Sequence, residues 1–185
     1  QVTIGDGDDS IKDAATISEI KQKTVNILSD GKLTITADKL ETSDVTHNAG
    51  QLNLNGTSAG SETKSEITGT GKTTIKSGIV IAKENITQGE IEIQGGKTLV
   101  NEAVIETTDA GITNNGTLEN NSNTANIKGE KISNTGTVKN TIGTIEADIE
   151  NTGSESKIEN AKNQTITGDI NNNHAGATVN NLGEI

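Results

Sequence analysis

The sequence has no cysteine, proline, methionine, phenylalanine, tyrosine or tryptophan, and all fifteen of its basic residues are lysine. Without cysteine, disulfide bonds and cysteine metal sites are excluded. Without aromatic rings, a hydrophobic core must be built from isoleucine, valine, leucine, alanine and threonine. Such small side chains suit a narrow coil that needs few of them better than a wide globular core, which normally includes large rings.

The charge balance is strongly acidic, with 26 acidic residues and a formal net charge of −11. An acidic surface repels phosphate groups, and the chain lacks both stacking rings and arginine, so we expect no nucleic-acid partner. Adsorption to anionic membranes is disfavoured for the same reason. Because no run of 18 apolar residues occurs, we also expect no membrane insertion by this segment.

High net charge with few large apolar residues is also typical of disordered chains, which is the main alternative to a folded structure. Two features favour folding. Isoleucine and threonine are abundant and prefer strands. Proline, which disordered chains usually contain, is absent.

One triplet recurs along the C-terminal part of the chain: an aliphatic residue, any residue, then asparagine. Eight such triplets lie between residues 112 and 185, whereas independent placement of these residue types predicts about three. They form two series with steps of about twenty residues. The first series is Ile112/Asn114, Ile132/Asn134, Ile149/Asn151 and Ile170/Asn172, and the second is Leu118/Asn120, Val138/Asn140, Ile158/Asn160 and Val179/Asn181. A repeat this short cannot bury its own apolar face, so it must stack on copies of itself.

Upstream, short segments alternate between aliphatic and polar residues and are separated by turn-forming residues. These segments are 25–27, 33–37, 52–54, 79–81 and 91–93. Their length suits strands rather than helices. The sequence therefore predicts an all-β fold, a single-stranded, right-handed parallel β-helix (β-solenoid) of about nine coils with roughly 18–21 residues each.

We divide the chain into two parts. Residues 1–22 are interpreted as an irregular N-terminal cap or first coil, in which Ser10–Asp13 also fit the start of a short helix. Residues 23–185 are interpreted as the solenoid, with the most regular repeats in 112–185. One aliphatic series runs through both parts: Ile17, Ile35, Leu54, Ile75, Ile93, Ile112, Ile132, Ile149 and Ile170.

The repeated asparagines have two interpretations. At the corner of a coil, asparagine tolerates unusual backbone conformations, and stacked side chains can bond to one another as in cross-β asparagine ladders. This structural role is the favoured interpretation. The alternative is a row of exposed amides that contacts a sugar or a host protein.

Few other motifs suggest chemistry. Gly5–Asp9 contains a single Gly/Asp motif, whereas calcium-binding β-rolls need a tandem series. His47 and His174 are far apart and have no ligand spacing. The pairs Asp8/Asp9, Glu90/Glu92 and Glu146/Asp148 are candidates for a carboxylate dyad, although a solvated acidic face explains them better. We therefore expect no catalytic, cofactor-binding or metal-binding residues, and no enzyme.

The stretch Ile112-Thr-Asn-Asn-Gly-Thr-Leu-Glu-Asn120 returns as Ile132-Ser-Asn-Thr-Gly-Thr-Val-Lys-Asn140. Both copies resemble coils in the passenger domains of bacterial autotransporter and haemagglutinin-like adhesins. The close match covers residues 112–185, and the rest is similar only in composition and coil length. The resemblance implies a β-helix stalk exported across the outer membrane of a Gram-negative bacterium, placed at the cell surface or outside the cell, and serving adhesion and virulence.

We expect a structural and adhesive module, a stalk with a multivalent binding surface for a protein or glycan on host or neighbouring bacterial cells. One alternative is self-association into a surface filament or layer, which uncapped solenoid ends would favour. A second is a β-helical polysaccharide-active enzyme, which the missing rings and arginine disfavour. Ice binding is a remote fourth possibility, because it needs a Thr-x-Thr pair on every coil and most coils lack one.

Overall fold

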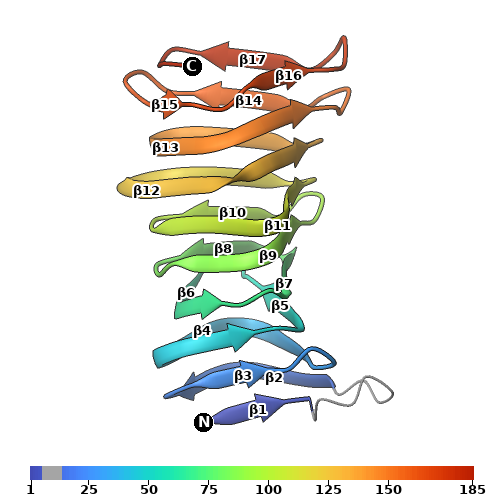
Figure 1. Cartoon of the computed structure of the whole chain (residues 1–185), viewed down its shortest axis with the longest axis vertical. Helices are drawn as coiled ribbons and strands as arrows, with labels where there is room; N and C mark the ends of the chain where they lie inside the picture. The colour runs from blue at the N-terminus through green and yellow to red at the C-terminus, as the bar shows by residue number, and fades with distance from the viewer. Residues whose placement is uncertain (6–13) are drawn as a thin grey trace.

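The chain forms a stack of coils with its two termini at opposite ends (Figure 1). The computed structural model describes residues 1–5 and 14–185, and the side chains of all of these except residues 37 and 38. Within the described residues there are 17 strands and no helix, joined in one sheet whose strand pairs are parallel. The predicted all-β parallel solenoid is therefore confirmed.

The strands are β1 (Val2–Ile4), β2 (Ala14–Gln22), β3 (Val25–Ile27), β4 (Lys32–Asn48), β5 (Gln51–Asn55), β6 (Ser61–Thr68), β7 (Lys72–Ser77), β8 (Ile79–Ala82), β9 (Ile86–Ile93), β10 (Thr98–Asn101), β11 (Val104–Asn114), β12 (Thr117–Asn134), β13 (Thr137–Asn151), β14 (Lys157–Asn160), β15 (Thr165–Ile166), β16 (Ile170–Asn172) and β17 (Thr178–Asn181). The longest, β12, has 18 residues, whereas short segments were expected. Long strands such as β12 run through corners, where residues 122–125 have no register partner in β13 and the register shifts.

Each coil contributes strand segments to three faces, which we call A, B and C. Face A consists of residues 14–17, 32–35, 51–54, 72–75, 90–93, 111–114, 131–134, 148–151 and 170–172. Face B consists of residues 19–22, 39–42, 61–64, 79–82, 98–101, 117–120, 137–140, 157–160 and 178–181. Face C consists of residues 2–4, 25–27, 46–48, 67–68, 86–88, 105–107, 126–128, 144–146 and 165–166.

The rungs of face A give the coil length directly. Eight registered steps join Ala15, Leu33, Leu52, Thr73, Ile91, Ile112, Ile132, Ile149 and Ile170, and each step takes 17 to 21 residues. The described residues therefore make about eight turns. At about 4.8 Å between paired strands, these turns span roughly 38 Å.

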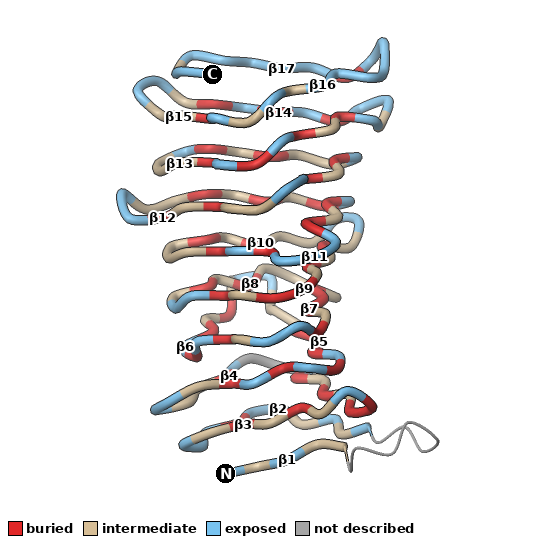
Figure 2. Tube along the Cα trace, viewed as in Figure 1, coloured by how far each residue is buried: buried red, intermediate tan, exposed pale blue. Residues whose placement is uncertain are grey.

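The core is a narrow stack of aliphatic side chains enclosed by the three faces. Figure 2 shows that buried residues recur from coil to coil along the stack. Along a strand, buried and more exposed residues alternate, as in β14, because successive side chains point to opposite sides. Residues in register then stack into columns; Ile86, Ile105 and Ile127 form part of the column under face C, and each is at most 1% exposed. A stack of small aliphatic side chains fills this core without aromatic rings.

The structure corrects the chain-long aliphatic series. From Ile17 to Ile93 the series follows one column of face A, but Ile93 is in register with Asn114. Ile112 is instead in register with Ile91, in the neighbouring column. The series therefore slips by two residues at this step, because residues two apart on a strand share a face and corners vary in length. The column that contains Ile17 and Ile93 therefore continues with Asn114 in the next coil.

The N-terminal segment is part of the stack. Strand β1 pairs with β3, and β2 pairs with β4 over most of its length. The alternative prediction of a helix that starts at Ser10–Asp13 and continues past Ala14 is therefore wrong, because residues 14–22 form a strand. Ser10–Asp13 themselves lie outside the described residues. Ile17 and Ile20 already face the same interior columns as the later coils.

Glycine allows adjacent coils to come close at the corner between faces A and B. A Cβ atom on Gly136 would lie 2.0 Å from the carbonyl oxygen of Gly116, and one on Gly116 would lie 2.2 Å from that of Lys97. No side chain fits at either position unless the backbone moves. The Asn-x-Gly spacing therefore combines a corner with close backbone stacking.

Candidate functional site

Two columns of asparagine run through the interior, one at the end of face A and one at the end of face B. The A ladder consists of Asn114, Asn134, Asn151 and Asn172, and the B ladder consists of Asn101, Asn120, Asn140, Asn160 and Asn181. All members except Asn172 and Asn181 are at most 2% exposed. Seven amide side chains are therefore buried in the stack, and each needs hydrogen-bond partners.

Within each ladder, one asparagine bonds to the next. The Nδ2 atom of each residue donates to the Oδ1 atom of its neighbour in the following coil, over 2.7–2.8 Å in the A ladder and 2.8–3.2 Å in the B ladder. Every one of these bonds runs in the same direction, with the donor on the coil nearer the N-terminus. The ladders therefore give the stack a chemical polarity as well as a register.

Asn134 shows how fully a ladder amide is used. Its Oδ1 atom accepts from Asn114 Nδ2 at 2.7 Å and from the Gly136 amide at 3.2 Å. Its Nδ2 atom donates to Asn151 Oδ1 at 2.7 Å, to the Lys157 carbonyl at 3.1 Å and to the Gly136 carbonyl at 3.2 Å. One side chain thus joins three coils, which offsets the cost of burying its polar atoms.

The structure places all eight asparagines singled out in the sequence in these two ladders. Their aliphatic companions Ile112, Leu118, Ile132, Val138, Ile149 and Ile158 are buried, Ile170 is half-buried, and Val179 is 38% exposed in the last coil. Asn101 also belongs to the B ladder, although it lies upstream of the two series recognised in the sequence. Its signal was available, because Leu99-Val100-Asn101 has the same aliphatic-x-Asn pattern.

A second group of buried amides lies at the corner between faces C and A. Gln88 Oε1 accepts from Asn48 Nδ2 at 2.6 Å and from the Thr73 hydroxyl at 3.1 Å. Asn48 and Gln88 are two coils apart, and Gly69 occupies the corner between them. Because Gly69 has no side chain, and glutamine is one methylene longer than asparagine, the bond reaches across a whole coil. Nothing in the sequence indicated this pair.

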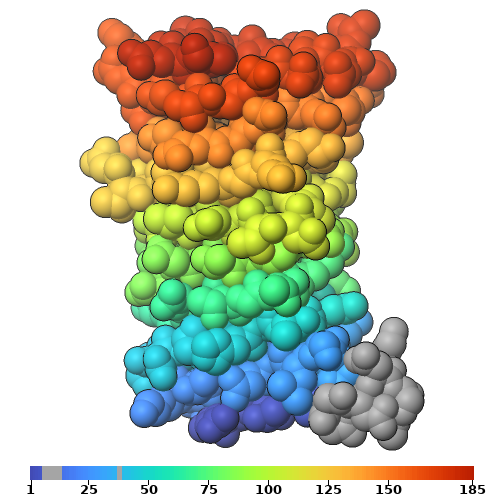
Figure 3. All heavy atoms as spheres, viewed as in Figure 1, coloured from blue at the N-terminus to red at the C-terminus, as the bar shows by residue number. Residues whose placement is uncertain are grey.

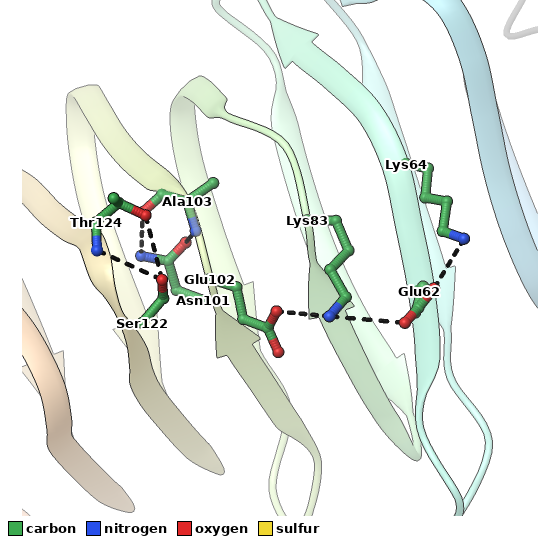
Figure 4. A network of polar contacts seen from close by, with 8 residues as sticks. All are labelled: Glu62, Lys64, Lys83, Asn101, Glu102, Ala103, Ser122 and Thr124. Carbon is green, nitrogen blue, oxygen red and sulfur yellow. Dashed lines mark hydrogen bonds and ion pairs between the residues drawn. The ribbon is translucent and has the colours of Figure 1, made fainter.

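Ion pairs connect coils on the outside of face B (Figure 4). Lys83 Nζ lies 2.5 Å from Glu102 Oε2 and 3.6 Å from Glu62 Oε1, and Glu62 also pairs with Lys64 at 3.0 Å. The bond to Lys64, with smaller contributions from Lys83, lowers the pKa of Glu62. The bond to Glu102 raises the pKa of Lys83 despite partial desolvation. The pairs of Lys83 with Glu62 and Glu102 link neighbouring coils, and because these side chains are partly exposed the pairs add little stability.

Glu90 and Glu92, one of the candidate carboxylate dyads, share a lysine. Lys72 Nζ lies 2.8 Å from Glu90 Oε1 and 2.6 Å from Glu92 Oε2. Desolvation lowers the pKa of Lys72, but its bonds to both glutamates outweigh this effect and raise the pKa. An ammonium group between two carboxylates explains why these residues lie together.

The remaining candidates are scattered. Glu146 accepts a hydrogen bond from Asn126 Nδ2 at 2.7 Å, and Asp148 accepts one from the Asp169 amide at 2.9 Å. His47 bonds to Thr68, and His174 Nδ1 accepts from the Gly176 amide within its own loop. Residues 6–9, including Asp8 and Asp9, lie outside the described residues. Among the residues described, no group of three or more potential ligands is arranged to hold a metal ion.

The side of the molecule seen in Figure 3 consists of successive coils stacked as bands. No helix in the described part of the chain is long and apolar enough to span a membrane. Comparisons with protein-family models, with curated proteins and with solved structures find no match. The buried ladders, the cross-coil ion pairs and the exposed faces are therefore the features on which a function can be argued.

Proposed function

We propose that the chain is a structural and adhesive β-solenoid module of a secreted bacterial surface protein, acting as a stalk and as a multivalent binding surface. The partner class is a protein or glycan on host cells or neighbouring bacteria. The observation that carries the proposal is the pair of ladders, which ties every coil from Asn101 to Asn181 to the next. Such a stack transmits position and force along its length without a wide core.

The outside of the same stack presents its side chains in regular columns. On face B, Thr98, Thr117 and Thr137 are in register in one outward column. The neighbouring column reads Val100, Glu119, Lys139 and Glu159. Threonine therefore recurs about 4.8 Å apart in the first column, and glutamate and lysine alternate from Glu119 to Glu159 in the second. Many weak contacts, presented on one rigid body, give strong overall attachment through effective concentration.

The experiment compares attachment of beads coated with the module to host cells and to bacteria, with soluble module as competitor. In the test variant, Glu119→Ser, Lys139→Ser and Glu159→Ser alter one outward column and leave the ladders intact. A matched control carries Ser133→Ala and Glu150→Ser on the outside of face A. We expect the face B variant, but not the control, to lose most of its attachment. If beads coated with the unaltered module attach no better than uncoated beads, the adhesive part of the proposal fails and the module acts only as a spacer.

A further inference from the structure

Face B carries an outward column in which the sign of the charge alternates from coil to coil. We call it the central column. Its N-terminal part is Glu19, Lys39 and Glu62, since Glu19 is in register with Lys39 and the pairing of the next strand places Lys39 beside Glu62. Its centre is Ile81 and Val100, and its C-terminal part is Glu119, Lys139 and Glu159.

Most charges of the central column are not neutralised within the chain. Apart from Glu62, its charged members take part in no ion pair among the described residues. This differs from the neighbouring column, in which Lys83 pairs with Glu102. The unpaired charges of the central column are therefore available to a partner.

The middle of the central column is aliphatic. Ile81 is in register with Val100, and Ile79 lies two residues before Ile81 on the same side of β8. All three side chains point out of the stack and are half-buried. Adjacent aliphatic side chains on the outside of a sheet indicate contact with another protein better than isolated ones do.

Face B is neutral, although the formal net charge of the chain is −11. The residues of face B include five acidic and five basic side chains. Because the excess negative charge lies on the rest of the chain, two copies repel each other least when their B faces meet. The charge distribution therefore favours a second copy of the chain as the occupant of this face.

The order of the charges excludes several orientations of that copy. In a parallel arrangement in register, each charged residue would meet its own copy, which is repulsive. A parallel arrangement displaced by one coil loses the two-fold symmetry that closed dimers normally have. An antiparallel arrangement centred between Ile81 and Val100 would set Glu62 against Glu119. One centred on Val100 would rely on Glu62, which already pairs with two lysines of its own chain.

We propose that face B pairs with face B of a second copy of this chain, antiparallel and with Ile81 opposite Ile81. The two-fold axis lies between the two faces and parallel to the strands, so each contact occurs twice. Lys39 of each copy then meets Glu119 of the other, and Glu19 meets Lys139. The aliphatic cluster forms the middle of the interface, and opposite charges that have no ion-pair partner in the described part of one chain meet on both sides of it.

This inference rests on the proposed function for the use of face B as a binding surface, and it names one partner for that surface. The two can fail separately. Attachment of the module to cells without a dimer in solution would overturn the dimer and keep the adhesive function. A dimer in solution without attachment to cells would do the opposite.

The test uses the whole chain and two charge reversals, Lys39→Glu and Glu119→Lys. Each variant alone sets like charges against each other at both copies of this contact. In a one-to-one mixture, a dimer with one copy of each variant again has opposite charges at both contacts. Matched controls, Lys32→Glu on face A and Glu106→Lys on face C, make the same changes in net charge away from face B.

Sedimentation velocity measures the association of each protein alone and of both mixtures, up to about 1 mM protein. The buffer contains about 0.15 M salt, where a screening length of about 8 Å limits the repulsion between the net charges. Circular dichroism checks that every variant keeps the strand content of the unaltered chain. A misfolded variant would not regain association on mixing, so recovery in the mixture also separates a lost contact from a lost fold.

We expect the unaltered chain to form a dimer with a dissociation constant of about 100 µM or tighter, as suits a single flat face. Each face B variant should weaken the dimer by about tenfold or more, and their mixture should recover to within about threefold. The controls should change it by less than about threefold. The proposal is overturned if the unaltered chain stays monomeric at about 1 mM, if the mixture associates no better than either variant, or if the controls weaken the dimer as much.

Discussion

Removing one amide from the middle of a ladder is the most direct test of how the stack is held together. In Asn134→Ala, Asn151 Oδ1 loses its ladder donor, and Asn114 Nδ2 keeps only its bond to the Thr137 carbonyl. The Lys157 carbonyl loses a side-chain donor as well. All of this takes place where Asn114, Asn134 and Asn151 are fully buried, so water cannot replace the lost partners without opening the coil.

The expected cost follows from those contacts. One buried acceptor left without a partner costs about 1–3 kcal/mol, and each further lost hydrogen bond contributes about 1 kcal/mol. Asn134→Ala should therefore lower the free energy of unfolding by about 3 kcal/mol. For a chain of this size, that corresponds to a fall of roughly 6–12 °C in the unfolding midpoint.

The assay is urea unfolding followed by circular dichroism, with Asn172→Ala as the matched control. Asn172 makes the same ladder bond but is exposed, so water replaces its partner and the loss should stay below about 1 kcal/mol. A double-mutant cycle of Asn134→Ala with Asn151→Ala should give a coupling of about 1–2 kcal/mol. If the buried and the exposed substitutions cost the same, the ladder bonds do not hold the coils together and the reasoning is refuted.

Three further predictions concern other parts of the stack. Gln88→Asn is one methylene too short to reach Asn48 across a coil, and should cost about 2 kcal/mol in urea unfolding; a neutral result would contradict the bridging role. Gly136→Ala should cost about 1–3 kcal/mol because its Cβ meets backbone, whereas Gly95→Ala, with its nearest atom at 3.7 Å, should be close to neutral; equal losses would show that close stacking is unimportant. Lys72→Gln should cost less than about 1 kcal/mol at neutral pH, since the ion pairs are partly exposed, and the loss should shrink in about 1 M salt. The folded state raises the pKa of Lys72, so the stabilisation by its ion pairs is present below about pH 10.5 and is lost as the pH rises through the raised value. If the variant is still less stable than the unaltered protein above that pH, the ion pairs are not the cause of the loss.

The ladder residues were readable from the sequence because buried asparagine has few alternatives. A polar residue that recurs at coil spacing beside an aliphatic residue must either face solvent or bond to its own copies. The Asn-x-Gly corner added a second, independent signal, since a stacked glycine leaves no room for a side chain. Asn101 carried the same signal one coil earlier, with its neighbour Leu99 fully buried.

Register was beyond the reach of the sequence. Ile91 and Ile93 both point inward on one strand. A step of 21 residues from Ile91 to Ile112 fits the length of a coil as well as a step of 19 residues from Ile93 to Ile112. Only the pairing of Asn114 with Ile93 decides between them. The choice depends on corner lengths, which vary from coil to coil and are fixed by the packing of the neighbouring coils rather than by local preference.

The stack of parallel coils and the residues that line its C-terminal interior could be inferred from the amino-acid sequence, because short repeats without aromatic rings can bury their aliphatic residues only against copies of themselves. The folded chain was needed to show which columns those residues join and where isoleucine is replaced by asparagine along a column. It was also needed to show that Gln88 bonds to Asn48 across Gly69. These are contacts between residues about twenty or forty positions apart. These contacts are set by how each coil packs against the preceding coil.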